Sequence, residues 1–133
     1  MKINWDAIGI GFVVTIVLGL VTSVIYAGTD GTLFASWGVI GVLGGLAAGL
    51  VAGGSMSDGA VHGGIATVFG SIITFVLVTF TTLLFAGVVP ALGVVVVGVL
   101  LLALYAIPGA IGGAIASWAK VRRADRRMAG AKA

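Results

Sequence analysis

Asp58 and His62 form the one ionisable pair in this sequence whose spacing could support chemistry. Side chains four residues apart meet on the same face of a helix, and carboxylate and imidazole groups are both common metal ligands. Two ligands do not close a metal site, however, and the chain has one histidine, no cysteine and no glutamate. We therefore expect helix capping, with neither a metal nor a cofactor. The same inventory, in which no serine is paired with a base, argues against an enzyme.

Hydroxyl groups recur through the segment that follows, at spacings of three, four and seven residues, at Thr67, Ser71, Thr74, Thr81 and Thr82. Such a stripe either lines a polar path or bonds to its own helix and its neighbours, and we expect the second use. Tyr105 is the one large side chain with a polar tip deep in the apolar body, and we expect its hydroxyl to bond a carbonyl or a hydroxyl of this segment. The candidate polar site therefore consists of Asp58, His62, Thr67, Ser71, Thr74 and Tyr105.

The composition is that of an integral membrane protein. Hydrophobic residues make up 60% of the 133 and charged residues 8%, with a mean hydropathy of +1.28. Between Lys2 and Lys120 the formal charges are three aspartates. A membrane helix needs about 20 apolar residues, and four segments qualify: 7–26, 33–52, 61–85 and 91–118. We predict an all-α membrane protein, with four transmembrane helices in a tightly packed, glycine-rich bundle.

The basic residues are concentrated in a tail, residues 120–133, that follows the membrane domain at 1–119. Six of the seven lysines and arginines lie there. Positive charge favours the cytoplasmic side, so we expect a multi-pass protein of the plasma membrane with both termini in the cytoplasm. Trp5 and Trp118 then mark the cytoplasmic boundary, and Tyr26 and Trp37 mark the opposite one.

The tail is expected to rest on anionic lipid headgroups, with an acidic cytosolic protein as the alternative partner and no nucleic acid. The residues that would contact headgroups are Lys120, Arg122, Arg123, Arg126 and Arg127.

Glycine at every fourth position is the most specific pattern, because it forms a groove in which two helix backbones can approach closely. The positions expected to pack are Gly41, Gly45, Gly49, Gly53, Gly63, Gly109 and Gly113. They serve either packing within one four-helix bundle or a glycine zipper between subunits around a pore. The motif GVLGG at 41–45 recurs as GAIGG at 109–113, which fits a duplicated helical hairpin.

Three local signals set the expected helix boundaries. Ser57 or Asp58 is predicted to cap the third helix after a loop at 53–58, because both side chains accept hydrogen bonds from free amides. Residues 87–90 are predicted to turn the chain, and Pro108 is predicted to kink the fourth helix.

The opening MKINWDAIGIGFVVTIVLG, the segment LAAGLVAGG and the segment SDGAVHGG together resemble a haloarchaeal family of small four-span membrane proteins of unknown function. Its most recognisable part is the DGAxHG segment, with Asp58, Gly59, Ala60, His62 and Gly63. The resemblance implies a membrane-embedded helical bundle in a salt-loving archaeon and no assigned activity. We expect a non-catalytic scaffold or accessory subunit, and the alternative is a small homo-oligomeric channel or transporter.

Overall fold

The computed structural model describes residues 3–25, 33–52 and 54–131, and within these ranges it is helical and contains no strand. The described helices are α1 (Trp5–Ile25), α2 (Leu33–Ala52), α3 (Met56–Ala86) and α4 (Val88–Ala131). α1, α3 and α4 are long and apolar enough to cross a membrane, and α2 adds a shorter apolar stretch at Gly38–Ala52. Helices suit lipid because they satisfy their backbone groups internally. The predicted all-α membrane bundle is confirmed.

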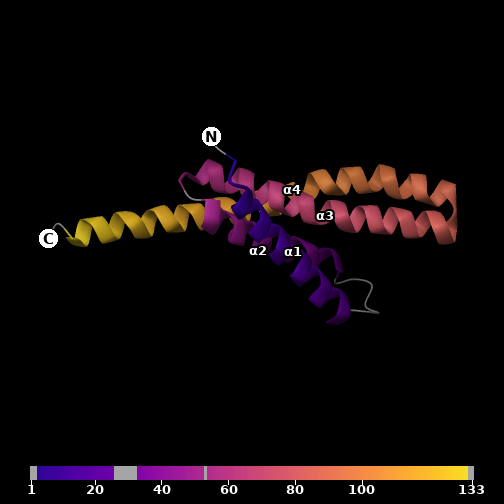
Figure 1. Cartoon of the computed structure of the whole chain (residues 1–133), viewed down its shortest axis with the longest axis horizontal. Coiled ribbons are helices and arrows are strands. Elements are labelled where there is room, and N and C mark those ends of the chain that lie inside the picture. The colour runs from indigo at the N-terminus through magenta and orange to yellow at the C-terminus, as the bar shows by residue number, and fades with distance from the viewer. Residues whose placement is uncertain (1–2, 26–32, 53, 132–133) are drawn as a thin grey trace.

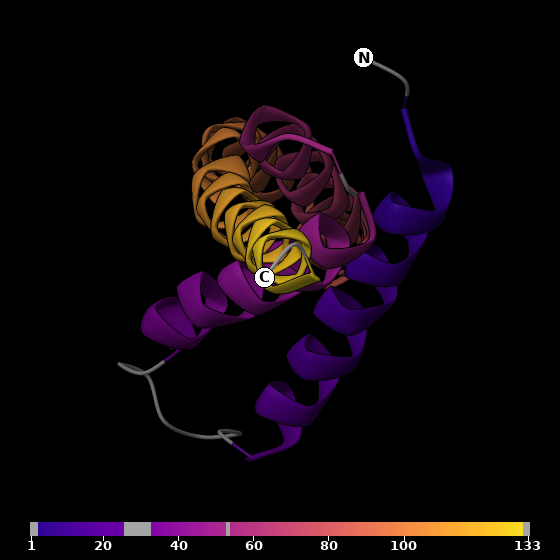
Figure 2. The ribbon, with the colours of Figure 1, turned by 90° about the vertical axis from the view of Figure 1, so that its left-hand side faces the viewer.

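α3 and α4 form a long antiparallel hairpin, and α1 and α2 pack against it toward one end (Figure 1). α1 packs against α2 and α3, and α4 packs against the same two helices. Seen end-on, α1 and α2 lie on one side of the hairpin (Figure 2). The tip of the hairpin reaches well beyond α1 and α2, and the C-terminal part of α4 projects at the opposite end (Figure 1). Close packing is therefore concentrated where α2, α3 and α4 cross.

The prediction that Ser57 or Asp58 caps α3 is wrong, because the cap is Ser55. The Ser55 backbone is extended, with φ −116° and ψ 162°, and its hydroxyl oxygen accepts the backbone N–H of Asp58 at 3.1 Å. The same hydroxyl donates to the Asp58 carboxylate at 2.9 Å. A serine with an acidic residue three positions later is a capping pair, so α3 begins inside the predicted loop.

The turn between α3 and α4 is shorter than predicted and consists of Gly87. This residue has a positive φ of 90°, which glycine adopts without steric cost. Its backbone N–H donates to the carbonyl of Thr82 at 3.1 Å, which ends α3. α4 then begins at Val88 in place of the predicted residue 91, with Pro90 in the first turn, where no backbone N–H is required. α4 continues as one helix through Pro108 to Ala131.

Glycines of α2, α3 and α4 bring the three backbones together at the crossing. A methyl group at Gly45 would overlap the carbonyl of Gly109, and one at Gly49 would overlap that of Gly113. From α3, a methyl group at Gly63 would overlap the same Gly109 carbonyl. We call this set the glycine core, and its members are Gly41, Gly45, Gly49, Gly59, Gly63, Gly109, Gly112 and Gly113. These contacts form within one chain. The predicted position Gly53 lies outside the described residues.

α1 joins the bundle through a second close contact between small residues. A Cβ atom at Gly11 would lie 2.7 Å from the Cβ of Ala48 in α2 and 2.8 Å from the Cβ of Ala66 in α3. Conversely, a methyl group at Gly44 of α2 would overlap the hydroxyl of Thr15 in α1. Backbones that approach this closely gain van der Waals contact, which drives helix association in lipid.

We predict that Gly45→Ala lowers the free energy of unfolding by about 1–3 kcal/mol, because the added methyl group overpacks the contact with Gly109. Gly93→Ala is the matched control, since nothing lies within 4 Å of a Cβ atom at that α4 position. The control should be neutral or slightly stabilising, because alanine favours helix. Thermal unfolding in detergent micelles, followed by circular dichroism, measures both. Equal stability of the two variants would contradict the proposed contact.

Candidate functional site

His62 is buried near the start of α3, with 1% of its surface exposed. Its Nδ1 lies 2.6 Å from the backbone carbonyl oxygen of Asp58. Its Nε2 accepts the backbone N–H of Asn4 at 2.8 Å. Nε2 can accept only if it carries no proton, and Nδ1 can bond a carbonyl only if it does. The hydrogen bonds therefore assign the neutral tautomer with its proton on Nδ1.

Asn4 is itself the cap of α1. Its side-chain oxygen accepts the backbone N–H groups of Asp6, at 3.1 Å, and Ala7, at 3.3 Å. His62 therefore fastens the beginning of α1 to the first turns of α3. The predicted pairing of Asp58 with His62 occurs only through the Asp58 main chain, because the carboxylate bonds Ser55. Within the described ranges, no group of three His, Cys, Asp or Glu residues is placed to hold a metal ion.

Two side chains of α4 satisfy the end of α2. Ser117 is buried and donates its hydroxyl proton to the carbonyl of Gly49 at 2.9 Å. The Lys120 ammonium group donates to the carbonyl of Leu50 at 3.0 Å. The last carbonyls of a helix have no intrahelical partner, and a cation there also meets the negative end of the helix dipole. Lys120, predicted to contact lipid headgroups, thus bonds the C-terminal turn of α2.

The hydroxyls of α3 bond mainly to their own helix. Thr67 donates to the carbonyl of Gly63 at 2.9 Å, and its oxygen lies 3.4 Å from the carbonyl oxygen of Gly41 in α2. Ser71 donates its hydroxyl proton to the backbone carbonyl of Thr67 at 2.9 Å, again four residues earlier in α3. Thr67 is 2% exposed and stands against Gly109 of α4 as well. It therefore links α3 to two neighbouring helices.

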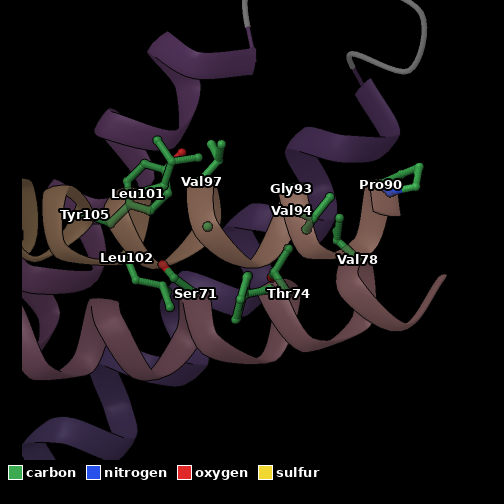
Figure 3. A pocket seen from close by; sticks show the side chains of 12 residues that line it. Ser71, Thr74, Val78, Pro90, Gly93, Val94, Val97, Leu101, Leu102 and Tyr105 are labelled. Carbon is green, nitrogen blue, oxygen red and sulfur yellow. The ribbon is translucent and has the colours of Figure 1, made fainter. Parts of the chain in front are cut away.

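Two cavities adjoin the hydroxyl-bearing part of α3. One, of about 500 Å³, lies between α3 and α4, and Ser71 and Thr74 point into it from α3, with Leu102 of α4 beside Ser71 (Figure 3). The other, of about 400 Å³, lies between α1, α2 and α3. Both volumes fall in the range of about 300–1,000 Å³ found for ligand pockets. Tyr105 of α4 lines both cavities.

The predicted polar site is therefore divided in two. Thr67, Ser71, Thr74 and Tyr105 line the smaller cavity together, whereas Asp58 and His62 lie outside its lining, at the start of α3. The cavity residues present hydroxyl groups in an apolar setting. Their chemistry is hydrogen bonding, because none of the described residues that line either cavity is charged.

The arginines after Trp118 differ in their contacts. The Arg122 guanidinium carbon lies 4.7 Å from the centroid of the Trp118 ring, a cation–π distance. Arg123, Arg126 and Arg127 are exposed and make no ion pair within the described part of the chain. Residues 119–131 of α4 project from the bundle (Figure 1).

The model of a family of unknown function, DUF5518, matches residues 5–119. The chain belongs to the DUF5518 family. Searches of curated proteins and of solved structures gave no match. The DUF5518 match covers α1, α2, α3 and α4 up to Ala119, and it includes His62, the glycine core and both cavities. It ends immediately before Lys120, where the basic segment begins.

Sequence reasoning missed three long-range hydrogen bonds in this DUF5518 protein. The bond between Asn4 and His62 joins residues 58 positions apart, and the bonds made by Ser117 and Lys120 join residues 68 and 70 positions apart. The small-residue stripe that includes Gly109 and Gly113 continues to Ser117, and this was the one available signal. Nothing local marks the other two.

We predict that His62→Ala destabilises the protein by about 1–3 kcal/mol, because the half-buried N–H of Asn4 loses its acceptor. His62→Gln should recover part of this loss, since its amide oxygen can replace Nε2. Val61→Ala, at an exposed neighbouring position, is the control. Denaturant unfolding in detergent gives the stabilities, and hydrogen exchange at the Asn4 amide reports the bond directly. Unchanged exchange in His62→Ala would contradict the role assigned to His62.

Proposed function

We propose that this protein is a non-catalytic scaffold or accessory subunit of a membrane assembly. The observation that supports this is that the buried polar side chains bond backbone groups of neighbouring elements. Within the described residues these are His62, Thr67 and Ser117. Each bonds a backbone group outside its own helix. His62 accepts the N–H of Asn4 at the start of α1, and Thr67 and Ser117 reach the carbonyls of Gly41 and Gly49 in α2. Polar groups used in this way fix the arrangement of helices and leave the outer surfaces for partners.

The proposed setting is the plasma membrane, with both termini in the cytoplasm. Two tryptophans support a common boundary. Trp5 follows Asn4, which bonds His62 of α3, and Trp118 follows Ser117, which stands against Gly59 of α3. Trp5 is 67% exposed and Trp118 is 49% exposed, as expected of aromatic residues at a membrane interface. Arg122 and Arg123 lie within about two turns of Trp118, close enough to the proposed boundary to reach anionic headgroups.

A small homo-oligomeric channel or transporter is the alternative. The smaller cavity favours it, because Thr15, Thr67, Ser71, Thr74 and Tyr105 bring five hydroxyl groups to its wall. The glycine core disfavours it, because the faces that would form a zipper between subunits are already packed inside one chain. A pore would therefore have to use other helix faces.

Native mass spectrometry from nanodiscs, together with ion flux in liposomes, separates these functions. The scaffold proposal predicts one copy per particle, alone or with a different protein, and flux equal to that of empty liposomes. A closed homo-oligomer that conducts ions would contradict it. In that case Ser71→Phe, which fills both cavities, should block flux, whereas Val76→Phe, at an exposed position outside them, should not.

A further inference from the structure

We propose that the C-terminal arm, residues 119–131 of α4, binds an acidic amphipathic helix of a cytosolic protein. The inference rests on the proposed function for the side of the membrane on which the arm lies. Three observations support it: the direction of the arm, the exposed Arg126 and Arg127, which make no ion pair among the described residues, and an exposed apolar seam between charged side chains.

The arm continues α4 without a break. α4 has 44 residues, which at about 1.5 Å per residue gives a length of about 66 Å. A bilayer core is about 30 Å thick, so a large part of α4 must extend beyond it. Sharp bends in helices occur at proline, at glycine or at bulges, and no proline or glycine lies between Gly113 and Gly130. The arm therefore projects away from the bundle and does not fold back along it (Figure 1).

Distance from the boundary limits the attraction of headgroups for the outer arginines. Arg126 lies eight residues beyond Trp118, which corresponds to about 12 Å along the helix axis. The potential of an anionic surface falls off within a Debye length, about 8 Å at physiological salt. Arg126 and Arg127 thus stand in the aqueous phase, where a soluble partner can reach them.

An apolar seam runs along the arm. Val121, Ala124 and Met128 are spaced three and four residues apart, and all three are exposed, Val121 to 40% and Met128 to 62%. This spacing is that of the contact positions of paired helices. In the same register, Arg127 borders one side of the seam and Asp125 borders the other. A partner helix would cover the seam and place charges opposite these two residues.

Charge selects the kind of partner. The arm carries five basic residues and one acidic residue, a net charge of +4, so two copies of the arm repel one another. An acidic helix is complementary to it. Nucleic acid would use the arginines but would leave the apolar seam uncovered, and Asp125 would repel its phosphates. An acidic amphipathic helix matches both the seam and the charge.

The test uses the full chain in nanodiscs of uncharged lipid and a synthetic acidic peptide helix. The peptide has leucines at the contact positions, glutamate at the flanking position opposite Arg127 and lysine at the one opposite Asp125. Its binding, measured by fluorescence anisotropy, should weaken about tenfold or more in Arg127→Glu, where like charges face each other across the seam. A peptide with lysine opposite position 127 should restore it. Arg126→Glu is the matched control, because it makes the same charge change on the far side of the helix and should weaken binding less.

Three results would overturn the inference. Equal weakening by Arg126→Glu and Arg127→Glu would mean that charge alone drives binding, and so would equal binding of a peptide with the same composition but no seam. The third is quenching from the lipid of anionic vesicles of a label at Met128→Cys, a unique site in a chain without cysteine, since the arm then lies on the membrane. Specific peptide binding by a conducting oligomer would overturn the proposed scaffold function and leave the arm inference standing.

Discussion

Backbone contact at the glycine core is the interaction on which the rest of this structure depends. In lipid, helices gain nothing from hiding apolar side chains, because the solvent is equally apolar. They associate when their surfaces fit closely, and glycine permits the closest fit. At Gly45, Gly49 and Gly63 a single methyl group would collide with a carbonyl of α4. A bundle with few charges and no cysteine is therefore held by shape where α2, α3 and α4 cross.

The polar side chains make sense as supplements to this contact. Ser117 and Lys120 bond the carbonyls of Gly49 and Leu50 in the last turn of α2, next to the contact between Gly49 and Gly113. Thr67 stands among α2, α3 and α4. His62 secures α1, which packs against α2 and α3 rather than α4. Away from the crossing, α3 and α4 keep large apolar side chains exposed toward the tip of their hairpin. The molecule thus has a closely packed crossing and an apolar hairpin that extends beyond it.

The sequence predicts what depends on local pattern. Helix identity follows from apolar length, and the close approach of α2 to its neighbours follows from glycine at Gly41, Gly45 and Gly49. The cap of α3 was placed two or three residues late, because Ser55, Ser57 and Asp58 are all capping residue types and the choice depends on where the chain turns. The role of His62 could not be predicted, because its Nε2 accepts the backbone N–H of Asn4, which lies 58 positions earlier in the sequence. The six-residue polar site divides for the same reason, since spacing along α3 does not reveal which neighbour each turn faces.

We assign the contacts of the glycine core to a single chain. Solid-state NMR of proteoliposomes with isotope-labelled glycine tests it without any mutation, through the cross-peak between the Cα atoms of Gly49 and Gly113. We expect the intensity per labelled chain to stay unchanged when labelled protein is diluted with a large excess of unlabelled protein. Loss of the cross-peak on dilution would mean that the contact joins different chains and that the glycine core is an interface between subunits.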